Sequence, residues 1–515
     1  MTQLLVIIAY LLLMLVIGYA ANRLSRGTAV DYFVASRSLG PVLLLLSLFS
    51  TTMTAFALVG STGRAYTLGV GVYGLLASAS GIVHSLCFFL IAVPLWSLGK
   101  RHGYTTQIQF FRDRLDSDWI GVLLFPFLVG LVVSYALLGV VGSGAVVSNV
   151  TKGAFAGCGW FPQSAYGVPA PIASAVVSLV VFVYVIFGGM RGTAWANALQ
   201  TVLFMSFGVV TFVVIANSLG GTDDFLENVR QAFLATSEAQ RSRAKIPKPL
   251  FLSFLFIPLS VAMFPHVFQN WLTARSAGAF KWPIVGYPLM IMALWLPCVS
   301  LGVWASAPSS GVPAGTSENQ VLAALVHQHA GPLLAGLLTA GVLAASMSFD
   351  SQIIAVGTMF TEDVVVHYAP AGRFSDRQII VMTRLFITAV LAVTLALSLF
   401  PRAVFDLGLW SFSGFTGLFP LVYAALYWRR LTAAGAMASV AATVAIWSVL
   451  FYRSGFGQNA KYAFPESPIP LVGQWVVPPM LPVVTILCVS TAALVSVSLC
   501  TPPPSSGTLS KFFRD

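Results

Sequence analysis

The chain has 515 residues, of which 57% are hydrophobic and only 8% are charged, and its formal net charge is +11. A soluble domain has about 25% charged residues, so this composition excludes a soluble enzyme and predicts a protein immersed in a lipid bilayer. We expect the positive charge to lie mostly in cytoplasmic loops, where it fixes the membrane topology, and it therefore needs no nucleic-acid partner.

The chain divides into apolar segments of the length that crosses a membrane. About 20 apolar residues span a bilayer core of about 30 Å, and thirteen such segments predict an all-α membrane protein. They cover residues 3–21, 41–62, 70–98, 120–148, 171–188, 195–218, 250–272, 283–306, 332–358, 379–400, 403–427, 432–452 and 478–500. Lys and Arg favour the inner loops if the N-terminus is outside and the C-terminus is cytoplasmic. We expect a multi-pass protein of the cell membrane with this orientation.

The second span contains a run of hydroxyl-bearing residues from Ser50 to Thr54, followed by Gly60. Such a run weakens a helix and glycine permits a turn, so we predict a break in this span. Carbonyls freed around Ser50 and Met53 can coordinate a cation. The alternative is that these small residues form a close helix-packing face.

Two histidines within the spans, His84 and His266, are the polar groups expected to border a central cavity, with packing roles as the alternative. The seventh span also contains Pro258 and Pro265, each of which removes a backbone donor and kinks its helix. A break there would be the counterpart of the break in span two, as in an inverted repeat. At the outer end of span two, Arg64 is expected to reach the interface or to attract an anionic substrate.

The ninth span carries Ala344, Ser348 and Ser351 at positions i, i+4 and i+7, which lie on one face of a regular helix. Carbonyl and hydroxyl oxygens with little charge suit a monovalent cation, whereas a divalent ion prefers several carboxylates. We therefore predict that this helix forms half of a sodium site.

The same span contains Asp350, the one acid expected deep within a span. Helix geometry places it about 200° around the axis from Ser348, so we predict a structural or gating role beside Arg191, Arg384 or Asn197. A proton-coupling role is the alternative. Further along, Glu362 and Asp363 are expected to be solvated at the cytoplasmic mouth.

Four stretches of the chain resemble the sodium:solute symporter family. They are residues 32–40, residues 188–200 (Gly-Gly-Met-Arg-Gly-Thr-Ala-Trp-Ala-Asn-Ala-Leu-Gln), the Pro-His pair at 265–266, and residues 346–361. The resemblance spans most of residues 1–455 and implies a LeuT-type core of two inverted five-helix repeats. It implies the following division: 1–40, first helix and cytoplasmic loop; 41–218, first repeat; 219–249, extracellular loop; 250–427, second repeat; 428–515, two accessory helices and a tail.

The resemblance also implies a sodium ion bound between spans two and nine. The implied ligands are the backbone oxygens of Ser50, Met53 and Ala344 and the hydroxyl of Ser348. This chain departs from the family at two positions. Met347 replaces a serine, and a thioether is a poor sodium ligand. Asn197 replaces the signature aspartate, so we expect Asn197 and Asp350 to influence coupling and gating.

Thr52, Phe56 and Ala57 match positions that bind substrate in sugar carriers of the family, but the polar residues that hold sugar hydroxyls are missing here. Half-helix N-termini can hold a carboxylate, so a monocarboxylate or amino acid is favoured over a sugar.

We therefore expect a secondary active transporter that couples the uptake of a small organic solute to Na+ by alternating access, and that catalyses no chemistry. Its expected partners are the solute, the sodium ion and the lipid bilayer. The alternative is an uncoupled or sensor-like protein that binds a solute without sodium-driven accumulation.

Overall fold

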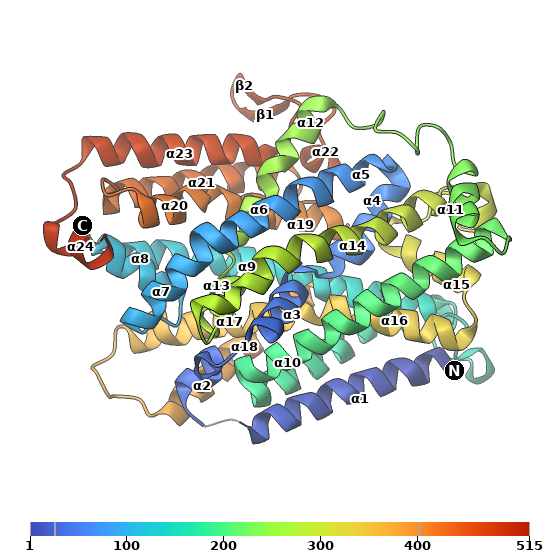
Figure 1. The fold of residues 1–515 in the computed structure, drawn as a ribbon, viewed down its shortest axis with the longest axis horizontal. Coiled ribbons are helices and arrows are strands. Elements are labelled where there is room, and N and C mark those ends of the chain that lie inside the picture. Colours follow the sequence, from blue (N-terminus) through green and yellow to red (C-terminus); the bar gives the residue numbers. More distant parts are fainter. Residues whose placement is uncertain (1, 25–26, 401–402, 514–515) are drawn as a thin grey trace.

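The computed structural model describes residues 2–24, 27–400 and 403–513 (Figure 1). Within these ranges, ten helices are long and apolar enough to cross a bilayer, and two bent helix pairs raise that number to twelve. The predicted all-α membrane class is confirmed. In the described part of the chain, the strands form one small hairpin, in which β1 (Ile469–Val472) pairs antiparallel with β2 (Trp475–Val477).

The spans are either single helices or runs of shorter segments. The single helices are α1 (Thr2–Arg23), α9 (Trp119–Val150), α10 (Ala170–Gly220), α14 (Lys281–Ala305), α18 (Asp376–Ser398), α21 (Ala433–Arg453) and α23 (Pro482–Cys500). The segmented spans are α3 (Pro41–Thr52) with η2 (Phe56–Gly60) and α4 (Ser61–Leu68); α5 (Gly71–Tyr73) with η3 (Gly74–Ser78), α6 (Ala79–Cys87), η4 (Phe88–Ala92) and α7 (Val93–His102); α12 (Lys248–Ser253) with η7 (Phe254–Met263) and α13 (Pro265–Leu272); α16 (Pro332–Ser346) with η11 (Met347–Phe349), α17 (Asp350–Met359) and η12 (Phe360–Val366); and α19 (Val404–Gly417) with α20 (Phe419–Tyr427).

Short elements connect the spans. They are α2 (Ala29–Val34), η1 (Ala35–Arg37), α8 (Gln107–Leu115), η5 (Ala156–Cys158), η6 (Pro162–Ser164), α11 (Phe225–Leu234), η8 (Ala277–Phe280), η9 (Pro308–Ser310), η10 (Glu318–Gln320), α15 (Val321–His329), α22 (Ala460–Ala463) and α24 (Ser506–Phe512). The segment 219–249, predicted as a loop, contains α11, which Asp224 caps by accepting hydrogen bonds from two backbone N–H groups.

Helix α10 is 51 residues long and reverses direction at Gly189, where φ is 53° and ψ is −154°. Its two halves lie side by side, because a Cβ added at Gly192 would be 3.7 Å from the carbonyl oxygen of Tyr184. In a continuous helix, residues eight positions apart are about 12 Å apart along the axis. The predicted spans 171–188 and 195–218 are therefore both contained in α10, which reconciles the twelve units with the thirteen predicted spans.

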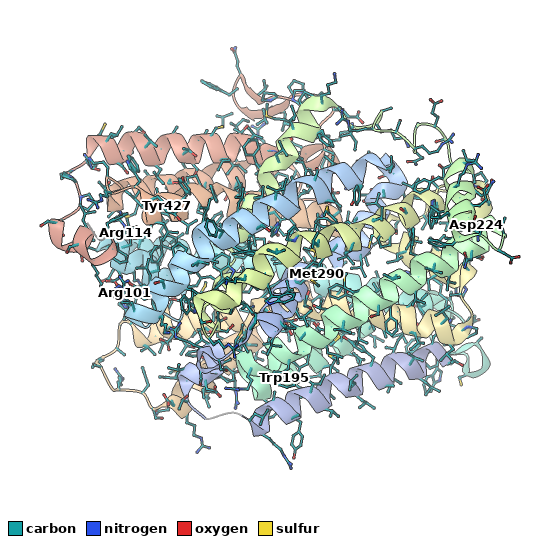
Figure 2. All side chains as sticks on the ribbon, viewed as in Figure 1. Arg101, Arg114, Trp195, Asp224, Met290 and Tyr427 are labelled. Atoms are coloured by element: carbon teal, nitrogen blue, oxygen red, sulfur yellow. The ribbon has the colours of Figure 1, made fainter. Side chains whose placement is uncertain are left out.

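The two spans predicted to be broken are bent. The chain turns by 58° between α3 and η2, and by 52° between η7 and α13, where Pro265 begins the new helix. Side chains fill the spaces between the helices, and the labelled Trp195 of α10 is 53% exposed on the outside of the bundle (Figure 2).

The last described segment folds back onto the protein. α24 packs against α8 at the end of the molecule opposite to the start of α1 (Figure 1). Lys511 forms an ion pair with Asp113, and the ring of Phe512 lies 6.1 Å from that of Phe110. The C-terminal helix α24 therefore has a defined binding position on α8.

Candidate functional site

The break in span two lies next to the 3-10 turn η11 in span nine. α3 packs against η11, and η2 packs against α16. Ser50 and Ser348, predicted to face one ion from these two spans, are both fully buried. The structure therefore brings together the two segments that the sequence predicted to form a sodium site.

Oxygen atoms are available on both segments. α3 ends at Thr52, and Met53 has left the helical region with φ −89° and ψ 76°, so the last carbonyls of α3 lose their partners from the next turn. The Ser348 hydroxyl donates to the carbonyl of Ala345 at 2.8 Å, which leaves its lone pairs free for a cation.

The ninth span is not the regular α-helix assumed from the spacing of Ala344, Ser348 and Ser351. Residues Met347–Phe349 form a 3-10 turn, η11, which has 3.0 rather than 3.6 residues per turn. The prediction of one straight face is therefore wrong. Ser351 instead turns toward Asn197, whose Nδ2 donates to the Ser351 hydroxyl at 2.8 Å.

Asp350 is fully buried within a cluster of neutral donors. Its carboxylate accepts hydrogen bonds from the Tyr184 hydroxyl at 2.8 Å and from the Ser351 hydroxyl at 3.0 Å. No basic side chain among the described residues forms an ion pair with it. Asn197 adjoins the cluster, and its Oδ1 has no hydrogen-bond partner.

Neither arginine proposed as a partner of Asp350 reaches it. Arg191 instead pairs with Asp31 at 2.7 Å, on the short helix α2. Arg384 lies over the ring of Tyr32, with 5.7 Å between its Cζ and the ring centroid. Of the three suggested neighbours, only Asn197 lies at Asp350.

A cavity of about 40 Å³ lies beside the break in span two. Four predicted substrate-site residues line it: Thr52, Phe56, Ala57 and His84. The other lining residues are Met53, Leu76, Ser80, Tyr135, Phe254, Ile257, Pro258, Ser260, Phe264, Trp295 and Phe412. The lining contains no Asp, Glu, Lys or Arg side chain, and the volume suits roughly three water molecules.

Two tyrosines that the sequence did not single out organise the cavity wall. The Tyr135 hydroxyl donates to the Thr52 carbonyl at 3.1 Å, and so satisfies a group that the helix break leaves without its usual partner. Tyr287 bonds to the Thr52 hydroxyl and stacks on His84, with ring centroids 5.2 Å apart. No periodic signal in the sequence distinguishes these rings from the many aromatic residues on the outside of the bundle.

His266 does not line the cavity. It lies behind the wall, with its ring centroid 5.2 Å from that of Phe264 and 5.4 Å from that of Tyr135. Both of its ring nitrogens lack a hydrogen-bond partner. Of the two histidines expected to border a central cavity, His84 lines this one and His266 does not.

An ionic cluster surrounds Arg64 of α4. This residue is only 6% exposed, so it neither reaches the interface nor faces an open vestibule as predicted. It pairs with Asp406 of α19 and with Glu318 at 3.3 Å. The rings of Phe405 and Phe464 lie 5.0 and 4.6 Å from its Cζ.

A second ionic cluster lies on α8, toward the opposite end of the molecule from α4 (Figure 1). Arg112 of α8 forms an ion pair with Asp363 at 3.4 Å and donates to the backbone carbonyl of the same residue at 3.0 Å. Beside it, Gln109 donates to Glu362 at 3.3 Å. Asp363 is fully buried, so the prediction of a solvated acid is wrong.

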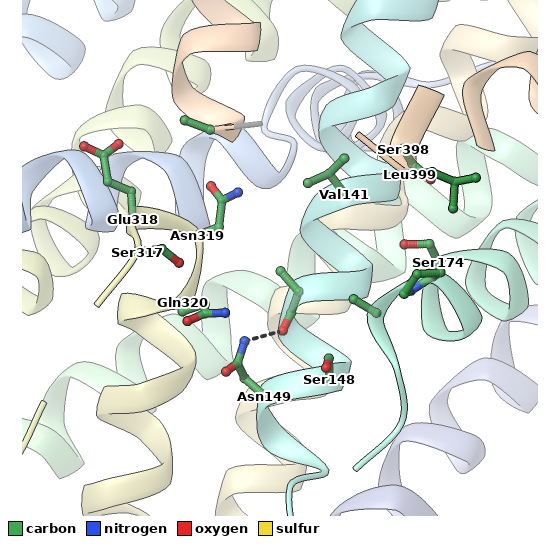
Figure 3. Close-up of a pocket in the computed structure, with 14 residues that line it drawn as sticks. Val141, Ser148, Asn149, Ser174, Ser317, Glu318, Asn319, Gln320, Ser398 and Leu399 are labelled. Atoms are coloured by element: carbon green, nitrogen blue, oxygen red, sulfur yellow. Dashed lines mark hydrogen bonds between the residues drawn. The ribbon is translucent and has the colours of Figure 1, made fainter. Parts of the chain in front are cut away.

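A larger pocket, of about 550 Å³, lies outside the Arg64 cluster (Figure 3). Its polar lining comes from Ser148, Asn149, Ser174, Ser317, Glu318, Asn319, Gln320 and Ser398. Glu318 both lines this pocket and pairs with Arg64, so the cluster forms the floor of the pocket.

Comparison with solved structures supports the fold. The chain is similar to a Na+-coupled sialic acid symporter solved in a substrate-bound outward-open state, with a TM-score of 0.70, 18% identity, and coverage of 98% of this chain and 99% of that one. The predicted LeuT-type architecture is confirmed by this likeness.

Sequence comparisons identify the family. The chain is 24% identical to an uncharacterized symporter of Bacillus subtilis (strain 168), over 86% of this chain and 87% of the relative. It is 25% identical to the high-affinity proline transporter PutP of the same organism (84% and 90%) and to a sodium/proline symporter of Staphylococcus aureus (strain JH9) (86% and 85%). The model of the sodium:solute symporter family matches residues 32–442. The chain is therefore a member of the sodium:solute symporter family.

Proposed function

We propose that this multi-pass membrane protein imports a small carboxylate-bearing solute together with sodium, with monocarboxylates and amino acids favoured. The observation that carries the proposal is the meeting of the broken span two with the 3-10 turn of span nine beside a cavity, with a buried ionic cluster toward each end of the molecule. Alternating access requires such a central site with a barrier on either side.

The proposed sodium ligands are the backbone oxygens of Ser50, Met53 and Ala344 and the hydroxyl of Ser348. Oxygen donors of this kind fit a monovalent cation, because they are numerous enough to replace water without the several carboxylates that a divalent ion prefers. Met347 contributes no oxygen side chain to this set. The site therefore depends on one hydroxyl and on carbonyls that the breaks release.

Asp350 and Asn197 are proposed to couple ion binding to the movement of span nine. A buried carboxylate without a basic partner is costly, so neutralising it with a cation or proton would favour a different packing of its neighbours. The hydrogen bonds from Tyr184 and Ser351 are the contacts that such a change would rearrange.

The solute is proposed to bind beside Thr52, Phe56, Ala57 and His84. The aromatic wall suits an apolar body, and the low polarity of the lining disfavours a sugar, whose hydroxyl groups would each need a buried partner. A carboxylate would be held by backbone N–H groups of the broken helices or by the sodium ion itself.

We also propose that the N-terminus is extracellular and the C-terminus cytoplasmic. The start of α1 and the end of α23 lie at opposite ends of the bundle, which supports termini on opposite sides of the membrane (Figure 1). The end that contains Arg64 is then extracellular, and the end that contains Arg112 is cytoplasmic.

Uptake by the purified protein in liposomes tests the proposal. Radiolabelled L-proline and propionate are offered separately, with an inward gradient of sodium or of choline. We expect accumulation of at least one solute above equilibrium with sodium only. Equal uptake with choline would remove sodium coupling, and an absence of uptake of all small carboxylates and amino acids would remove the solute class.

The second candidate is an uncoupled or sensor-like protein. Met347 and Asn197 favour it, since each lacks the oxygen or charge that the family pattern has at its position. Saturable binding of a solute without accumulation in the same liposomes would support this candidate.

A further inference from the structure

Buried hydrogen bonds connect the broken end of α3 to Asp350 through helix α10. The Ser50 hydroxyl donates to Oε1 of Gln200 at 3.2 Å. The amide of Gln200 adjoins the hydroxyl of Tyr184, which in turn donates to Asp350 at 2.8 Å. The side chains of Ser50, Gln200 and Asp350 are fully buried, and Tyr184 is only 1% exposed.

The reversal of α10 at Gly189 makes this connection possible. Tyr184 lies on the first half of the helix and Gln200 on the second. In a continuous helix, these two residues would be about 24 Å apart along the axis. The reversal instead places them side by side, between α3 and α17, both of which α10 contacts.

We infer that Gln200 is a positioning residue for the sodium site, and that Tyr184 links it to Asp350. This inference rests on the proposed sodium site. Ser50 is two residues from the end of α3, where carbonyls lack partners in the next turn. Anchoring its side chain to Gln200 fixes the rotation of this last turn, and hence the direction in which the Ser50 carbonyl points.

The bonding of the Gln200 amide supports a directional role. The Gln200 side-chain oxygen accepts from Ser50, whereas its Nε2 donates to the weak acceptor Sδ of Met14 at 3.8 Å. The hydroxyls of Tyr184 and Tyr10 adjoin the same amide. The amide is therefore oriented by Ser50 on one side and by Tyr184 on the other. A change in the hydrogen bonding of Asp350 reaches the ion-binding turn through these two side chains.

Binding of ²²Na+ to the purified full-length protein in nanodiscs tests the inference without requiring transport. Gln200→Leu removes both the acceptor oxygen and the donor nitrogen of the amide. We expect it to raise the sodium concentration for half-saturation about tenfold. Gln200→Glu keeps an acceptor for Ser50, and we expect a shift of less than threefold. Tyr184→Phe keeps the buried ring and removes only the hydroxyl, and we expect an increase of about threefold.

A double-mutant cycle separates positioning from general damage. In the Ser50→Ala background the hydroxyl that Gln200 holds is already missing, so adding Gln200→Leu should change sodium binding less than twofold. The matched control is Gln269→Leu, which removes another buried amide, one that donates to the Phe33 carbonyl at 2.7 Å and to Thr358 at 2.9 Å. The control should lower the unfolding temperature and leave sodium half-saturation within twofold.

The outcomes distinguish this inference from the proposed transport. Unchanged sodium binding in folded Gln200→Leu, additive effects of Ser50→Ala and Gln200→Leu, or an equal shift in the control would each overturn the inference. If Gln200→Leu does not fold, unchanged binding in Tyr184→Phe overturns the link to Asp350, and unchanged binding in Ser50→Ala overturns the positioning of the turn. A wild-type protein that binds sodium but accumulates no solute would overturn the proposed transport alone. A wild-type protein that binds no sodium would overturn both.

Discussion

The hydroxyl of Ser348 is the side-chain oxygen on which sodium affinity is expected to depend. It lies in the 3-10 turn η11, which packs against the end of α3. Its proton is directed to the carbonyl of Ala345, so the oxygen presents its lone pairs elsewhere. The side chain of the neighbouring Met347 offers sulfur in place of a hydroxyl oxygen.

We predict that Ser348→Ala raises the sodium concentration for half-maximal uptake about tenfold, equivalent to about 1.4 kcal/mol. The KM for the solute at saturating sodium should change less than twofold, because Ser348 does not line the cavity. Ser346→Ala is the control, since this buried hydroxyl donates to Val342 at 2.9 Å within the same helix. Sodium dependence that is the same in Ser348→Ala and wild type would exclude Ser348 as a ligand.

At the scale of residues, the sequence predicted which residues line the cavity better than it predicted their side-chain contacts. Thr52, Phe56, Ala57 and His84 line the cavity as expected. Tyr287 was not predicted, because its role depends on a hydrogen bond with Thr52, which lies 235 residues away in the chain. Neither helical periodicity nor composition encodes such pairings.

At the scale of elements, the reversal of α10 is the feature that assembles the polar cluster. Gly189 has a φ of +53° and a ψ of −154°, a combination that residues with a side chain adopt only at a cost of about 1–3 kcal/mol. A Cβ at this position would also lie 2.7 Å from the ring of Tyr32. The Gly-Gly motif therefore has a structural reason in the fold itself.

We predict that Gly189→Ala lowers the thermal unfolding temperature of the purified protein and reduces the fraction that elutes as a single species. Strain and overlap with Tyr32 act together, so a loss of about 2–4 kcal/mol is expected. The control is Gly208→Ala in the second half of the same helix, where an added Cβ meets nothing within 4 Å. Gly208→Ala should be neutral or slightly stabilising. Equal stability of the two variants would contradict the strained reversal.

The sequence predicted the two bends that proline or a run of hydroxyl residues causes. It did not predict the 3-10 turn in span nine, which no such residue indicates. Pro265 indicated the bend in span seven, and the hydroxyl-rich run after Ser50 indicated the bend in span two. The 3-10 turn at Met347–Phe349 contains neither proline nor glycine. It depends on packing against α3 and α9, which local propensity does not contain.

At the scale of the whole molecule, one buried ionic cluster lies toward each end of the bundle (Figure 1). The Arg64 cluster joins α4 to α19, and the Arg112 cluster joins α8 to η12. The sequence did not predict either pairing, because Arg64 and Asp406 are separated by 342 positions. Opening one end requires the loss of buried ion pairs, which are costly to break on one side only.

We predict that Asp406→Asn opens the end of the molecule that contains Arg64 more often. Accessibility is measured with Ala57→Cys, which places a thiol in the cavity, and a membrane-impermeant thiol reagent, with mass spectrometry reporting modification at residue 57. The rate should rise about tenfold, because Arg64 loses its anionic partner on α19. Asp223→Asn, which removes an exposed acid in the segment 219–249, should leave the rate unchanged. No acceleration in Asp406→Asn would exclude the cluster as a barrier.

The docked tail bears on how this protein should be handled. Lys511 and Phe512 hold α24 to the helix that carries Arg112. A purification handle fused directly after α24 would pull on that helix, and kinetics recorded with it would mix transport with an artefact of tethering. A cleavable handle at the start of α1 lies at the opposite end of the bundle and does not disturb the contacts between α24 and α8 (Figure 1).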